Sequence, residues 1–88
     1  MGLSAVAGDK SITLSWSRSP NDDLDGYNVF RAVGDGAFEK VASKATLPAY
    51  TDAAVEAGKR YRYTVSAVDK AGNESMRSME ASTQVEQP

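Results

Sequence analysis

Three aspartates, Asp22, Asp23 and Asp25, lie within four positions of one another. From Asn21 onward the sequence around them reads Asn-x-Asp-x-Asp-Gly, which is close to the opening of a calcium-binding loop. Carboxylate oxygens are the ligands that Ca²⁺ prefers in proteins. This acidic segment is therefore the first place in the chain to look for chemistry.

A complete calcium loop also needs a ligand at its ninth position and a bidentate glutamate at its twelfth. Counted from Asn21, these positions hold Val29 and Ala32. From Tyr27 onward the residues alternate as in a strand, so no helix follows the motif. The helix-loop-helix calcium site is excluded, and we expect no bound metal.

Two interpretations of the acidic segment stay open. The weaker one is a looser metal site at a domain junction, formed by Asp22, Asp23, Asp25 and a backbone carbonyl. The alternative is a loop between the second and third strands, since Pro20, Asn21 and Gly26 are turn formers and aspartate caps turns with its own side chain.

The composition removes most other classes of chemistry. The chain has no histidine and no cysteine, so it lacks the usual general base, the commonest metal ligand and any thiolate. A net charge of −2 gives no basic field for nucleic acid. No apolar run is long enough to span a membrane, and we expect no membrane partner. We predict that the chain is not an enzyme and needs no cofactor.

Apolar and polar residues alternate with a period of two along most of the chain, which is typical of strands with one buried face. The clearest strands are expected around Ile12–Trp16, Tyr27–Val29, Tyr61–Ala67 and Met79–Val85. Weaker candidates occupy residues 3–7, 38–42 and 49–52. Turn signals rich in glycine, asparagine and aspartate separate these runs.

Seven short strands in 88 residues predict an all-β fold, an immunoglobulin-like antiparallel β-sandwich. We expect one domain over residues 1–88, with an ordered core over about 3–85 and polar ends that belong to a linker or to the expressed fragment. The side chains expected to fill the core share the inward phase of their strands: Ile12, Leu14, Trp16, Tyr27, Val29, Tyr50, Tyr61, Tyr63 and Val65.

The order of the motifs resembles that of a fibronectin type III domain over nearly the whole chain. Trp16 ends the second expected strand, as in that family. The element from Val55 to Tyr61 reads apolar-x-x-Gly-x-x-Tyr and resembles the family's tyrosine corner, in which the hydroxyl bonds to nearby backbone. The stretches "DLDGYNVFR" and "AVDKAGNES" are similar to modules of secreted bacterial polysaccharide-degrading enzymes and cell-surface proteins.

This resemblance implies a non-catalytic spacer or accessory module of a larger secreted or surface protein, and so an extracellular or cell-surface location. Its partners would be the neighbouring domains of the same chain, and the isolated domain would be a monomer.

The alternative is a binding module that contacts polysaccharide or a protein partner through its loops or through an exposed face. Phe30 is expected on that face, out of phase with Tyr27 and Val29, and Arg62 next to it. Arg31, Arg60 and Arg62 are expected on a solvated polar face.

Overall fold

The computed structural model describes residues 2–8, 10–18 and 24–85, which form seven strands and no helix. Among these residues there is accordingly no helix long and apolar enough to cross a membrane. The strands are, in chain order, β1 (Ser4–Ala7), β2 (Ile12–Ser15), β3 (Leu24–Val33), β4 (Glu39–Ala45), β5 (Ala49–Asp52), β6 (Arg60–Asp69) and β7 (Ala81–Gln84).

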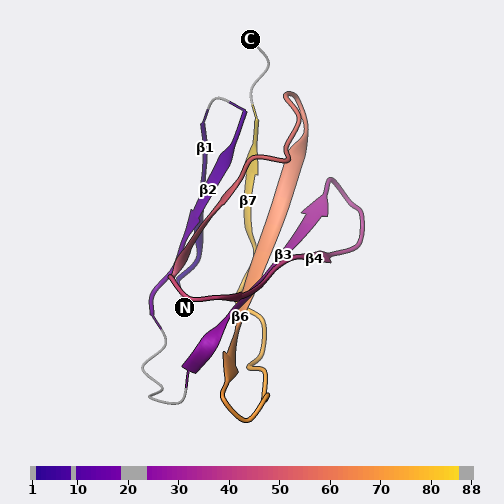
Figure 1. Cartoon of the computed structure of the whole chain (residues 1–88). Helices are drawn as coiled ribbons and strands as arrows, with labels where there is room; N and C mark the ends of the chain where they lie inside the picture. Colours follow the sequence, from indigo (N-terminus) through magenta and orange to yellow (C-terminus); the bar gives the residue numbers. More distant parts are fainter. Residues whose placement is uncertain (1, 9, 19–23, 86–88) are drawn as a thin grey trace.

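The strands form two antiparallel sheets, in the orders β1-β2-β5 and β4-β3-β6-β7. Figure 1 shows β1 and β2 at the left of the molecule and the long β6 to their right. β3 and β6 have ten residues each and form the centre of the four-stranded sheet. The predicted all-β sandwich is therefore confirmed.

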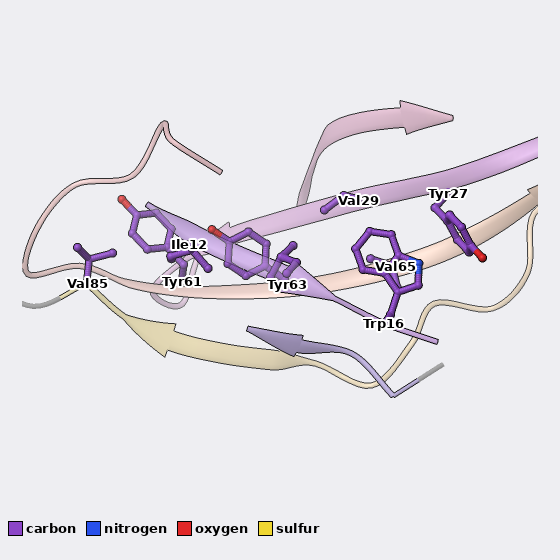
Figure 2. Close-up of a cluster of buried hydrophobic side chains, with 9 residues drawn as sticks. Ile12, Trp16, Tyr27, Val29, Tyr61, Tyr63, Val65 and Val85 are labelled. Atoms are coloured by element: carbon purple, nitrogen blue, oxygen red, sulfur yellow. The ribbon is translucent and has the colours of Figure 1, made fainter. Parts of the chain in front are cut away.

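The core lies between the sheets and consists of side chains from alternate positions of each strand, as the two-residue period requires. Figure 2 shows Trp16 beside Tyr27, and their rings meet edge to face with centroids 5.3 Å apart. The buried cluster is Ile12, Leu14, Trp16, Tyr27, Val29, Tyr61, Tyr63, Val65 and Val85. Eight of the nine expected core residues are buried. Tyr50 is only half-buried because it lies on the edge strand β5.

The start of β3 corrects the expected loop between the second and third strands. β3 begins at Leu24, so Gly26 lies inside a strand and is not a turn residue. A Cβ at Gly26 would lie 2.7 Å from the backbone of Lys44, whose φ is 55° at a bulge in β4. Glycine is needed there for close approach of a neighbouring strand. The rest of the expected loop, residues 19–23, lies outside the described residues.

The last strand is also shorter than predicted. β7 begins at Ala81, and Met79 is 90% exposed although its phase matches that of Ala81 and Val85. The residues before Ala81 contact β6 through serine side chains, so the two-residue alternation does not continue backward from β7.

Candidate functional site

The acidic segment contributes one described carboxylate, that of Asp25. Its Oδ2 lies 3.4 Å from Nζ of Lys44, and both side chains are open to solvent. Asp22 and Asp23 lie outside the described residues. Within residues 2–8, 10–18 and 24–85, no three potential metal-ligating side chains gather at one place. The loose metal site therefore stays a prediction with only Asp25 placed, and that carboxylate already has a cationic partner.

We expect millimolar calcium chloride to change the melting temperature of the protein by less than about 1 °C, because a ligand stabilises the folded state only when it binds that state. Asp25 is paired with Lys44, and apolar residues occupy the two distal ligand positions of the motif. Differential scanning calorimetry with and without calcium measures the shift. A rise of several degrees that Asp23→Ala abolishes would restore the metal site.

The proposed contact residue Phe30 lies on the outer face of the four-stranded sheet, as its phase predicted, but it is only 5% exposed. The guanidinium carbon of Arg77 lies 3.9 Å from the centroid of the Phe30 ring, and Nζ of Lys40 lies 5.9 Å from it. The expectation of an exposed Phe30 is therefore wrong. The segment that follows β6 runs back along β6 and places the Arg77 side chain over the Phe30 ring.

Arg62, the second proposed contact residue, uses all three guanidinium nitrogens within the protein. Its Nε and Nη2 donate to the carbonyl oxygens of Gly34 and Gly36, at 2.8 and 2.7 Å. Its Nη1 lies 2.8 Å from Oε1 of Glu80, and the guanidinium stacks 4.9 Å from the centroid of Phe38. Arg62 thus links the β3–β4 turn and Glu80, the residue directly before β7, to the four-stranded sheet.

Glu74 covers the remaining part of this outer face. Its carboxylate accepts hydrogen bonds from the hydroxyl of Ser66 and from Nδ2 of Asn28, at 3.2 Å for the latter. Both donors are buried. The hydrogen bond from Ser66, followed by that from Asn28, lowers the pKa of Glu74. The sequence carried no signal for this contact, because Glu74 and Asn28 are 46 residues apart.

A second polar cluster lies at the edge of the core and joins the two sheets. Asp52, on β5, is 2% exposed and receives Nη1 of Arg31 at 2.9 Å and the hydroxyl of Tyr63 at 2.8 Å. Arg31 and Tyr63 lie opposite each other on β3 and β6. Burial, the hydrogen bond to Asp52 and its charge raise the pKa of Tyr63 far above the usual range. An unfolded tyrosine has a pKa of about 10. The stabilisation that the Tyr63 hydroxyl provides is therefore fully present below that pH and is lost as the pH rises above it.

The expected solvated strip of Arg31, Arg60 and Arg62 is therefore wrong for Arg31. The inward direction of Arg31 could have been predicted from the sequence. Arg31 follows Tyr27 and Val29 by even spacings, so it must face inward with them. A buried arginine requires an acidic partner, and Asp52 has the inward phase of Tyr50. Because the carboxylate is nearly inaccessible and fully bonded, this cluster joins the sheets and offers no place for a substrate.

The expected tyrosine corner is present. The hydroxyl of Tyr61 accepts a hydrogen bond of 2.7 Å from the backbone N–H of Glu56, across the turn that leads into β6. Val55, the apolar residue of the same element, packs against the core. Together with Trp16 at the end of β2 and the strand order of both sheets, this geometry is that of the family expected from the sequence.

Comparison with known families agrees, since the model of the fibronectin type III domain matches residues 2–84. The chain belongs to this family. An Fn3-like protein from Clostridium thermocellum has 36% sequence identity and a TM-score of 0.83, over 99% of this chain and 91% of that one. A β-1,2-glucanase from Parabacteroides distasonis has 31% identity and a TM-score of 0.84, over 98% of this chain and 12% of the glucanase.

An amylopullulanase from Thermoanaerobacterium saccharolyticum is 43% identical over 77 residues, which are 86% of this chain. The chain spans only 6% of the length of that relative. This fibronectin type III domain is therefore similar to small segments of much larger enzymes, and its neighbours in such proteins are other domains of the same polypeptide.

Proposed function

We propose that the chain is a single non-catalytic accessory module, which acts as a spacer within a larger secreted or surface bacterial protein, such as a glycoside hydrolase or another polysaccharide-acting enzyme. The observation that carries this proposal is the coverage of its relatives. Nearly the whole chain matches both an amylopullulanase and a β-1,2-glucanase, yet it makes up 6% and 12% of them. The same module accompanies enzymes of different names, which favours a role separate from the reaction.

The structure suits a stiff spacer. The molecule is elongated, with extents of 44 × 22 × 18 Å. Its sheets are joined by a continuous apolar core and by the bonds of Asp52 to Arg31 and Tyr63. On the outer face, three side chains attach a turn and the segment after β6 to the central strands. They are Arg62, Arg77 and Glu74. A unit of this kind holds its two ends at a fixed separation.

The second candidate is a binding module for polysaccharide or a protein partner. Its main support was an exposed Phe30, and that ring is covered. Arg62 has its donors engaged within the domain. The loops remain as contacts, so this candidate rests on weaker grounds than the spacer.

Under the spacer proposal the partners are neighbouring domains, no cofactor is needed and the isolated domain is a monomer.

The spacer proposal predicts that the module changes geometry rather than affinity. In affinity electrophoresis against insoluble and soluble polysaccharides, the isolated module should migrate as a non-binding protein does. Placed between a glycanase domain and a carbohydrate-binding domain, it should raise activity on an insoluble polysaccharide above that given by a Gly-Ser linker, because linker stiffness sets the distribution of distances between the domains. Activity on a soluble oligosaccharide is the control and should not change.

Two results would contradict the proposal. Retention of the isolated module by a polysaccharide gel, lost when the exposed loop residue Leu47 or Asp35 is replaced, would favour the binding module. Equal activity of the module and the Gly-Ser linker on the insoluble polysaccharide would exclude a geometric role.

A further inference from the structure

β7 covers only part of the edge of β6. The four residues of β7 pair with Arg60–Tyr63, while β6 continues for six more residues, to Asp69. A strand edge that is left open presents unpaired N–H and C=O groups to any other chain. Along this continuation, Val65 and Ala67 direct their backbone groups toward the open side.

Two serines close this edge by the same set of bonds. The N–H groups of Ser75 and Ser78 donate to the carbonyl oxygens of Ala67 and Val65, at 2.8 and 2.7 Å. In return, their hydroxyl oxygens accept the N–H groups of Ala67 and Val65, at 2.9 and 3.0 Å. Each serine therefore replaces one residue of a paired strand, with its side chain in the place of the carbonyl. We call residues 74–80 the capping segment.

The capping segment repeats every three residues. In Ser75-Met76-Arg77 and Ser78-Met79-Glu80 the serine faces β6 and the methionine faces solvent, 90% exposed in both units. The charged residue lies over the outer face of the sheet, with Arg77 on Phe30 and Glu80 on Arg62. A strand in a sheet has a period of two, so beyond the isolated bridge between Glu74 and Val68 this segment bonds to the sheet without continuing its ladder.

The free side of the capping segment is a poor template for a further strand. The hydroxyls of Ser75 and Ser78 donate to the carbonyl oxygens of Met76 and Met79, at 3.0 and 3.1 Å. These carbonyls are therefore engaged by their own segment. A new strand would need donors and acceptors at two-residue intervals, and a three-residue repeat does not supply them.

We infer that the capping segment prevents β6 from pairing edge to edge with a second copy of this chain, with Ser75 and Ser78 as the residues that do it. β6 carries a buried apolar face through Tyr61, Tyr63 and Val65, and such a strand with an open edge is a site of self-association. This inference does not depend on the spacer proposal, because it concerns only the isolated domain.

The test is the Ser75→Ala/Ser78→Ala double variant, which leaves the N–H groups of Val65 and Ala67 without acceptors. Sedimentation velocity at about 0.1 mM, within the range in which open edges associate, should show a monomer for the wild type and dimers or larger species for the variant. Ser82→Ala is the matched control. This serine is exposed on β7, and among the described contacts its hydroxyl bonds only to Arg60, so the control should stay monomeric. Ser75→Thr/Ser78→Thr keeps both hydroxyls and should also stay monomeric.

Amide hydrogen exchange at Val65 and Ala67 reports whether the edge has opened. Faster exchange there together with a monomeric double variant would overturn the inference, and so would a wild-type chain that already associates at this concentration. If the double variant does not fold, Ser78→Ala alone opens the edge at Val65, and the same two measurements decide the question.

Discussion

Replacing Asp52 with asparagine should lower the free energy of unfolding by roughly 3 kcal/mol, the lower end of the range for breaking a buried ion pair. Asparagine keeps the shape of the side chain but removes the charge that holds the guanidinium of Arg31, 2.9 Å away. The Arg31 side chain is 18% exposed, which gives it some access to water and places the expected loss at the lower end. Urea denaturation followed by circular dichroism measures the loss.

Asp25→Asn is the matched control for Asp52→Asn. Asp25 also pairs with a cation, Lys44, but across 3.4 Å and in solvent, so its replacement should cost less than about 1 kcal/mol. Equal losses for the two variants would show that the Asp52 pair does not join the sheets. Asp52→Asn combined with Arg31→Met removes both charges, and it should recover part of the loss because no buried guanidinium is left unpaired.

Replacing Trp16 with alanine should lower the free energy of unfolding by about 3–5 kcal/mol, the usual range for deleting a large buried aromatic. The indole is almost fully buried, contacts the ring of Tyr27 and lies in the cluster between the sheets. Its removal leaves a cavity that strands from both sheets cannot close without shifting. Equilibrium denaturation followed by far-UV circular dichroism measures this loss, since Trp16 is the only tryptophan of the chain.

Leu47→Ala serves as the control for Trp16→Ala. Leu47 is 67% exposed in the turn between β4 and β5, so removing its side chain should change the free energy of unfolding by less than about 0.5 kcal/mol. A loss below about 1 kcal/mol for Trp16→Ala would place the indole on the surface, and the strand phase assigned to β2 would then be wrong.

The strand phase explains why most of the fold could be predicted. A residue inside a strand faces the same side as its neighbours two positions away, whatever the rest of the chain does. This rule placed Ile12, Leu14 and Trp16 in the core and predicted the seven strands. It also placed Phe30 on the outer face correctly, while the expectation of its exposure was wrong. Phase assigns a side chain to a face, but it does not say what covers that face.

The contacts on the outer face could not be predicted because they join distant segments. Arg77 covers Phe30, Glu74 bonds to Asn28 and Arg62 bonds to Gly34, across 28 to 47 residues of sequence. The contacts of Arg77 and Glu74 depend on the path that residues 70–80 take beside β6. Both the backbone N–H groups and the hydroxyls of Ser75 and Ser78 bond to β6 along that path, and serine hydroxyls in this role leave no strand pattern in the sequence.

The sequence alone therefore determined the sandwich and most of its core through local alternation, and the tyrosine corner through the resemblance of the motif around Tyr61 to the fibronectin type III family. Only the tertiary structure decided that Arg31 reaches Asp52 on the other sheet, that Phe30 is covered and that two serines close the edge of β6. The physical reason is that burial and hydrogen-bond partners belong to pairs of segments brought together by folding. A single strand's pattern fixes the direction of its side chains and leaves their partners open.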